Sequence, residues 1–159
     1  MEYTKNTNPH YYEENQDCSN CGSFAFQIEE WYSPDEYFEE DMGMSVEEWI
    51  DNCIWNGWDE YDMSDEFAGI LVNYILNDFD DVRYIVQISE LEQNEELIAF
   101  RTFVTTDGNW DFHFKVLRNG MWLEKCGSDP TRFCEKDDWH NGLMEYISYT
   151  SYFARKLTN

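Results

Sequence analysis

The sequence predicts an α+β fold in which helices pack against an antiparallel sheet of about four strands. Apolar residues at helical spacing occupy the first half of the chain, over residues 21–32, 46–57 and 64–78. Segments rich in β-branched and aromatic residues follow, between residues 82 and 126. A run of helices followed by a run of strands is typical of an α+β domain with antiparallel pairing. The length of 159 residues fits a single domain over 1–159.

The N-terminal third is expected to begin with a flexible arm and a helix. Residues 1–16 are polar, contain Pro9 and show no clear period. The first helix is expected to begin at Cys21, because apolar or small residues then recur on one face. It should end at Ser33-Pro34, since the residue before a proline disfavours the helical region.

Two further helices are expected before the sheet. Ser45 and Glu48 have the spacing of a capping box, which predicts a short helix that ends near Gly57. The next helix is expected to begin at Ser64 or Asp65 and to run to about Asp78. Acidic residues in its first turn interact favourably with the helix dipole.

The strands are expected at residues 82–88, 96–106, 111–118 and 121–126. Asp107-Gly108-Asn109 is a turn signal. Asn119-Gly120 predicts a tight hairpin between the last two strands, because both residues tolerate positive φ. A C-terminal helix that begins at Asp137 or Asp138 completes the prediction, with Trp139, Leu143, Ile147, Tyr152 and Phe153 as its buried residues.

Composition excludes several classes of function. The chain has 34 acidic and 10 basic residues and a formal net charge of −24. Direct nucleic-acid binding is disfavoured, because the phosphate backbone would repel such a protein. No segment approaches the roughly 18 apolar residues of a membrane span, and no secretory signal is recognisable. The five cysteines are an odd number, which favours a reduced, cytoplasmic protein over a disulfide framework.

Cys21 and His113 could form a nucleophile–base pair. A cysteine at a helix N-terminus has a lowered pKa, and a nearby histidine can accept its proton. His113 lies in the middle of a predicted strand. The structural alternative is a small buried cysteine and a hydrogen-bonded histidine of the sheet. Composition and spacing alone favour this alternative.

Two sequence blocks favour the nucleophile–base pair over the structural alternative. NCGSFAFQIEEWYSPDE (20–36) and DFHFKVLRNGMWLEKCGSDP (111–130) resemble two blocks of a family of largely uncharacterised phage and bacterial proteins. Their order and content are similar to those of the NlpC/P60 and papain-like cysteine hydrolases. In these hydrolases a cysteine opens a helix, a histidine follows on a strand, and a third polar residue lies on the next strand. The blocks cover about a quarter of the chain.

The resemblance implies that Cys21 is the nucleophile, His113 the base and Glu124 the third residue. Glu124 can accept the imidazole N–H, whereas its neighbour Lys125 cannot. Strand alternation leaves open which of the two faces His113. Cys18 is an alternative nucleophile, because the NlpC/P60 cysteine follows an aspartate directly and Cys18 follows Asp17.

A zinc site is a weaker chemical alternative, and no cofactor or metal is predicted. Cys18 and Cys21 have the spacing of half a zinc motif. Cys126 and Cys134 are eight residues apart and do not form the second tight pair. His113 and His140 are the histidines that could complete such a site.

Two functions from different classes follow. The first is a phage-type cysteine hydrolase that cleaves a peptide or amide bond, with a preference for cationic substrates. The second is an acidic mimic of nucleic acid that occupies a basic groove of a host protein, such as a defence nuclease, on an inactive hydrolase fold. Residues 35–66 contain thirteen acidic residues and no Lys or Arg. The predicted binding face comprises Glu39, Glu40, Asp41, Glu47, Glu48 and Asp51.

Overall fold

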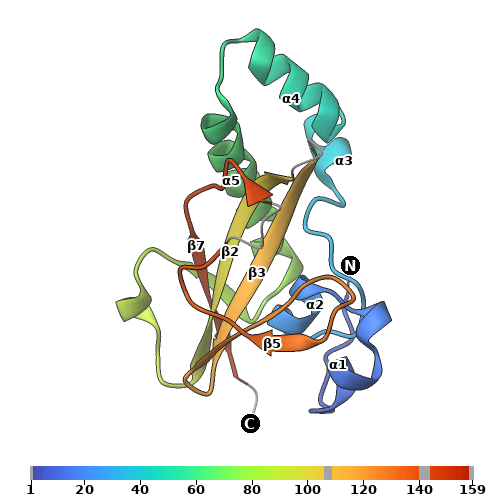
Figure 1. The fold of residues 1–159 in the computed structure, drawn as a ribbon, viewed down its shortest axis with the longest axis vertical. Coiled ribbons are helices and arrows are strands. Elements are labelled where there is room, and N and C mark those ends of the chain that lie inside the picture. The colour runs from blue at the N-terminus through green and yellow to red at the C-terminus, as the bar shows by residue number, and fades with distance from the viewer. Residues whose placement is uncertain (1, 106–108, 140–143, 158–159) are drawn as a thin grey trace.

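A computed structural model describes residues 2–105, 109–139 and 144–157. The described residues form five α-helices and an antiparallel sheet. The helices are α1 Tyr11–Glu14, α2 Cys21–Phe26, α3 Phe38–Met42, α4 Val46–Trp55 and α5 Glu60–Asp78, with short 3-10 turns at Gln16–Cys18 and Ile88–Glu90. Helices α2 and α5 pack against the sheet, and α3 and α4 lie beyond one end of it (Figure 1). The strands are β1 Val82–Ile85, β2 Glu95–Thr105, β3 Trp110–Arg118, β4 Met121–Lys125, β5 Thr131–Phe133, β6 Met144–Glu145 and β7 Ser151–Lys156.

The sheet has more strands than the sequence predicted. Six strands lie in the order β1-β7-β2-β3-β4-β5, and the short β6 pairs with β2. Every pairing is antiparallel. The predicted α+β class is therefore confirmed, and so are strands within the four predicted segments. None of the described helices has the length and apolar character needed to cross a membrane.

The core lies between the sheet and helices α2 and α5. Phe100 of β2 stacks on Phe114 of β3, with ring centroids 4.8 Å apart. Phe26 of α2 meets Phe114 edge-on and stacks on Phe79. These rings are almost fully buried, so they contribute strongly to the hydrophobic stabilisation where α2 meets the sheet.

Helix α2 begins as predicted but is shorter. It ends at Phe26 instead of residue 32, because Gln27 adopts the left-handed conformation at φ 52°. The N–H of Ile28 then donates to the carbonyl of Ser23 at 3.0 Å. The Tyr12 hydroxyl donates to the carbonyls of Ser23 and Ile28, at 2.9 and 3.0 Å. These bonds satisfy carbonyls at the helix end.

The next two helices agree with the sequence except at one boundary. Ser45 caps α4 by accepting the N–H of Glu48 at 3.1 Å, as its spacing predicts. Helix α5 begins at Glu60, several residues before the predicted Ser64 or Asp65. Asp59 is its cap and accepts the N–H of Asp62 at 2.8 Å. An aspartate cap stabilises the exposed N–H groups of the first turn.

The hairpin between β3 and β4 was predicted correctly. Asn119 and Gly120 both have positive φ, at 54° and 75°, and Arg118 pairs with Met121. In the other predicted turn, Asp107 and Gly108 lie outside the described residues.

The predicted C-terminal helix is wrong. Residues 151–156 form β7, which lies between β1 and β2 and pairs with both. Phe153 and Ala154 are fully buried on opposite faces of the sheet, as strand alternation requires. Trp139 is buried against the sheet, outside any described helix or strand. Residues 140–143, including Leu143, lie outside the described residues.

The segment expected to be a flexible arm packs onto the domain. Tyr12 is buried, and Tyr3 stacks on Phe79 with ring centroids 5.4 Å apart. Lys5 forms an isolated antiparallel bridge with Ile28.

A buried ion cluster ties three strands together. Glu96 of β2 accepts from Arg118 of β3 at 2.8 Å and from Arg155 of β7 at 2.7 Å. Burial alone would raise the pKa of Glu96, but the two guanidinium groups outweigh it and hold the pKa below its usual value. Removal of one partner from such a cluster leaves buried charge uncompensated.

We predict that Glu96→Gln lowers the free energy of unfolding by about 3 kcal/mol at neutral pH, because two arginines lose their counter-ion. Urea denaturation followed by circular dichroism measures it. Glu95→Gln is the matched control, since Glu95 pairs with the partly exposed Arg83. Equal losses of unfolding free energy in both variants would contradict a special role for the buried Glu96 cluster.

Candidate active site

His113 and Glu124 form a buried hydrogen-bonded pair. Nε2 of His113 lies 2.8 Å from Oε1 of Glu124, and both residues are less than 8% exposed. The second carboxylate oxygen accepts from Nε of Arg132 at 2.9 Å. Burial alone would raise the pKa of Glu124, but His113 and Arg132 hold it below its usual value. Glu124 is therefore a carboxylate at neutral pH, and Nε2 donates to it.

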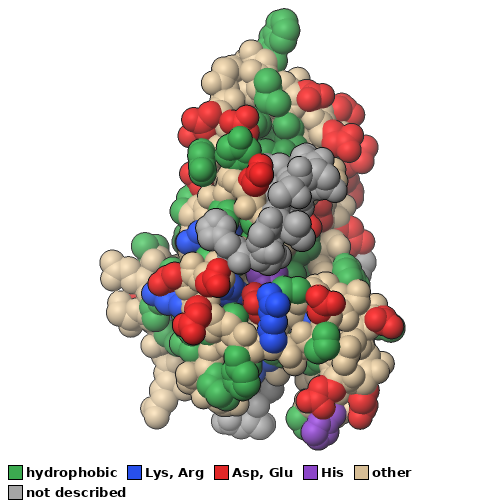
Figure 2. All heavy atoms as spheres, in the orientation of Figure 1, with side chains coloured by type: hydrophobic (Ala, Val, Ile, Leu, Met, Phe, Trp, Pro, Cys, Tyr) green, Lys and Arg blue, Asp and Glu red, His purple; other side chains and the backbone are tan. Residues whose placement is uncertain are grey.

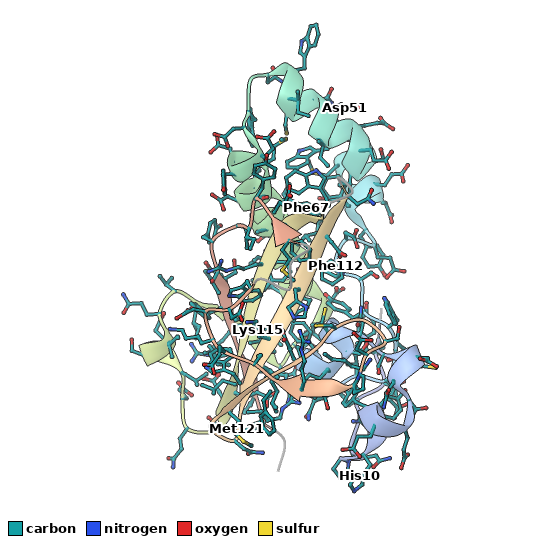
Figure 3. The ribbon with its side chains drawn as sticks, in the orientation of Figure 1. His10, Asp51, Phe67, Phe112, Lys115 and Met121 are labelled. Carbon is teal, nitrogen blue, oxygen red and sulfur yellow. The ribbon has the colours of Figure 1, made fainter. Side chains whose placement is uncertain are left out.

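The structure resolves which residue of β4 faces His113. Lys115 pairs with Glu124 across the β3–β4 ladder, so Glu124 shares its face with Lys115 and His113. Lys125 points to the opposite face. Phe112 and Lys115, labelled in Figure 3, bracket His113 on β3. The choice of Glu124 as the partner of the imidazole agrees with this geometry.

Lys125 holds the segment that leads into α2. Its ammonium group is fully buried and donates to the carbonyls of Gln16, Ser19 and Gly127, at 2.7, 2.6 and 2.5 Å. Burial lowers the pKa of Lys125. Three carbonyl acceptors are the full complement of an ammonium group. The start of α2 is thereby fixed to the strand that carries Glu124.

Asn20 and Gly22 fix the start of α2 from the other side. The Asn20 side chain caps the helix through the N–H of Ser23 at 3.0 Å. It also exchanges two hydrogen bonds with the backbone of Tyr32. A Cβ on Gly22 would lie 2.7 Å from the Tyr32 ring, so only glycine permits this approach. Cys21, between them, has a closely defined position.

Cys21 is a buried, neutral thiol. Burial raises its pKa to about 12, and a hydrogen bond with the backbone of Phe114 only partly opposes this. The lowered pKa expected at a helix N-terminus is therefore wrong for this cysteine. Helix α2 has only six residues, and the loss of hydration dominates. The alternative nucleophile, Cys18, is exposed in the preceding 3-10 turn.

Cys21 and His113 line the same cavity, which has a volume of about 370 Å³. The β3–β4 ladder begins at Lys115, so no described strand pairs with the preceding part of β3 on that side. The cavity lies beside this part and is also lined by Asp35 and Asp111. Desolvation raises the pKa of both aspartates, and the charge of Asp35 adds to the shift of Asp111. A cationic group in this cavity would relieve both effects.

A second cavity, of about 530 Å³, is also lined by His113. Its walls include Glu124, Arg132, Cys134 and Trp139. The Trp139 ring meets the His113 ring edge-on, with centroids 6.1 Å apart. His113, Cys126 and Met144 line both cavities, so the two spaces adjoin at the imidazole.

The structure also brings together a possible metal-ligand set. The donor atoms of His113, Glu124 and Cys126 lie within 4.8 Å of one another. Arg132 donates to Glu124 and also to Sγ of Cys126, at 3.3 Å. A guanidinium group thus already supplies the positive charge between these donors. Burial and the charge of Glu124 raise the pKa of Cys126, which opposes the thiolate that a metal needs.

This set differs from the zinc alternative considered from the sequence. Cys18 is exposed, whereas Cys21 is buried at the start of α2. Neither belongs to the donor set found among the described residues. His140 lies outside the described residues.

The predicted binding face is exposed on α3 and α4. Acidic side chains gather along this side of the molecule (Figure 2), and Asp51 points away from α4 (Figure 3). Among the described residues, none of the six predicted acids forms an ion pair. Asp41 accepts from the Tyr74 hydroxyl at 2.7 Å and is partly structural.

Sequence reasoning missed the residues that position the site. Asn20 could have been identified, since asparagine before a predicted helix start is a cap signal. Arg132 and Trp139 were not distinguishable, because their role depends on how β5 and the following segment fold over β3 and β4. Comparison with protein-family models, with curated proteins and with solved structures gave no match.

We predict that Glu124→Gln lowers the free energy of unfolding by about 2 kcal/mol at neutral pH. Because the pKa of Glu124 is lowered in the folded state, its ionised side chain stabilises that state. The full stabilisation is present above the ordinary pKa of 4.5. That stabilisation is lost as the pH falls through the lowered value, so the difference between wild type and variant should shrink below pH 4.5.

Urea midpoints measured across this range test the prediction. Glu92→Gln is the control, because Glu92 is exposed. A difference that does not depend on pH would contradict the assigned ionisation of Glu124.

Proposed function

We propose that this protein is a cysteine hydrolase of the NlpC/P60-like or papain-like kind, with Cys21 as nucleophile, His113 as base and Glu124 as orienting residue. The observation that carries the proposal is the 2.8 Å bond between His113 Nε2 and Glu124, beside the cavity that His113 shares with Cys21. With Nε2 directed to Glu124, Nδ1 is the nitrogen available to accept a proton. The helix–strand–strand order of the three residues agrees with the resemblance.

The raised pKa of Cys21 specifies the form of the mechanism. The resting thiol is neutral, so Nδ1 of His113 accepts its proton as Sγ bonds to the acyl carbon. The tetrahedral intermediate then expels the leaving group, which takes that proton from His113. Water, activated by His113, attacks the thioester, and loss of the thiol releases the acid. Glu124 stabilises the imidazolium that forms transiently.

The cavity favours a substrate with a positive charge. Asp35 and Asp111 lie on the Cys21 side, and their desolvated carboxylates would be stabilised by an amine or guanidinium. This supports a peptide or small amide with a cationic group near the scissile bond.

A test can use p-nitrophenyl acetate as an acyl donor. We predict acetylation of Cys21, detected by peptide mass spectrometry, and continued release of nitrophenol. Cys21→Ala should abolish turnover, and His113→Ala should slow it by about 10²–10⁴-fold, the usual contribution of a general base. Cys18→Ala, which changes the neighbouring exposed cysteine, should have no effect. Acetylation of Cys18 with Cys21 unmodified would contradict the proposal.

A second candidate function is binding of a basic host protein by the anionic face in place of nucleic acid. The observation that favours it is the exposed set of acids on α3 and α4, which form no ion pairs within the described residues. Unpaired surface charge of one sign attracts an oppositely charged surface over long distances, and salt weakens the attraction.

Displacement of a fluorescent DNA duplex from linker histone tests the second candidate. We predict that the triple variant Glu39→Lys, Glu40→Lys and Glu47→Lys displaces DNA less effectively than a control with the same net charge. That control carries Glu14→Lys, Asp17→Lys and Glu92→Lys, at exposed sites elsewhere. Equal displacement by both variants would show that only net charge matters and would contradict a specific face.

A further inference from the structure

The end of α4 and the start of α5 expose a group of apolar side chains. Trp55 is 90% exposed, Ile54 56% and Tyr61 59%, and Trp58 is 39% exposed in the connecting turn. These helices form the upper end of the molecule (Figure 1), where hydrophobic and acidic side chains lie side by side (Figure 2). Single exposed apolar residues are ordinary, but a group of large ones bordered by charge is typical of a protein-binding surface.

A hollow of about 470 Å³ adjoins this group. Its lining consists of Gly57, Trp58, Asp62, Asp65, Glu66 and Tyr149. Two aromatic rings and three carboxylates therefore surround one space. Trp58 comes from the α4–α5 turn and Tyr149 from the segment before β7, so the hollow joins two distant parts of the sequence.

Backbone hydrogen bonds fix both aromatic residues. The N–H of Tyr149 donates to the Asp65 carboxylate at 3.0 Å. The N–H of Trp58 donates to the carbonyl of Cys53 at 3.0 Å, after Gly57 turns the chain at φ 86°. The backbone that carries both rings is thus held in place before any partner binds, which reduces the entropy cost of binding.

The lining matches the chemistry of an arginine side chain. A guanidinium group stacks on aromatic rings and donates bidentate hydrogen bonds to carboxylates. Asp62, Asp65 and Glu66 form no ion pair with any described residue, so the described part of the chain supplies no cation there. The net charge of −24 adds long-range attraction to a basic partner.

We propose that this surface docks a basic protein segment, with an arginine of the partner in the Trp58–Tyr149 hollow and apolar partner residues against Ile54 and Trp55. The inference rests on the second candidate function and specifies where the basic partner is anchored. It is independent of hydrolysis at Cys21, because the hollow shares no lining residue with either cavity beside His113.

The test is a titration of the ¹⁵N-labelled full chain with acetyl-Leu-Arg-Leu-amide, followed through the indole N–H resonances. Trp58→Phe assigns the Trp58 resonance. We expect this resonance to shift on binding, and the citrulline peptide, which is similar in shape but neutral, to bind about tenfold more weakly. The affinity of the lysine peptide should lie between those of the arginine and citrulline peptides, since lysine is charged but lacks the planar stacking group.

Two variants in the hollow and one outside it complete the design. Tyr149→Ala and Asp62→Asn should each weaken the binding of the arginine peptide several-fold. Asp62→Asn removes a charge without removing a ring. Glu14→Gln, at an exposed site outside both the hollow and the anionic face, should leave its affinity unchanged. Equal binding of the arginine and citrulline peptides, or an unshifted Trp58 resonance, would overturn the anchor. If DNA displacement still depended on the α3–α4 acids, the second candidate function would stand without this anchor.

Discussion

The site depends on the opposite directions of two consecutive residues on β4. Glu124 points to the face that carries His113 and holds Nε2 of the imidazole, whereas Lys125 points to the other face and holds the carbonyls that precede α2. One strand therefore fixes the candidate base on one face of the sheet and, on the other face, the segment that leads to the candidate nucleophile. Strand alternation has a fixed period of two, so a shift of one residue in β4 would misplace both. Glu124 and Lys125 are both buried, and each side chain has its hydrogen-bond partners, as burial of a charge requires.

The electrostatic character differs across the molecule. Near His113, the buried Glu124 is paired with Arg132, and the Glu96 cluster lies further along the sheet. On α3, α4 and the start of α5, carboxylates are exposed and form no ion pairs within the described residues. The chain therefore combines a closely packed candidate catalytic region with a separate anionic surface. A hydrolytic site and a docking site for a basic partner can coexist on such a molecule, because they draw on different residues.

Local signals in the sequence were sufficient for several elements. The capping residue Ser45, the Asn119-Gly120 turn and the start of α2 at Cys21 were all predictable, because each depends on a few neighbouring residues. The choice between Glu124 and Lys125 was limited by chemistry, since only a carboxylate can accept from the imidazole.

The end of α2 was not predictable, because the left-handed conformation of Gln27 is supported by Tyr12 and by long-range packing. Residues 151–156 carry apolar residues that fit either periodicity, and pairing with both β1 and β2 decides for a strand. The raised pKa of Cys21 likewise follows from burial, which the sequence does not show.

The central claim is that Glu124 holds His113 so that Nδ1 serves the Cys21 thiol. The most direct measurement is the ¹⁵N spectrum of the His113 ring in the wild type and in Cys21→Ala, at a pH where the imidazole is neutral. The account predicts the Nε2–H tautomer in both proteins and a changed Nδ1 resonance when the thiol is removed. An Nδ1–H tautomer, or an Nδ1 resonance that does not respond to loss of the Cys21 thiol, would contradict the account.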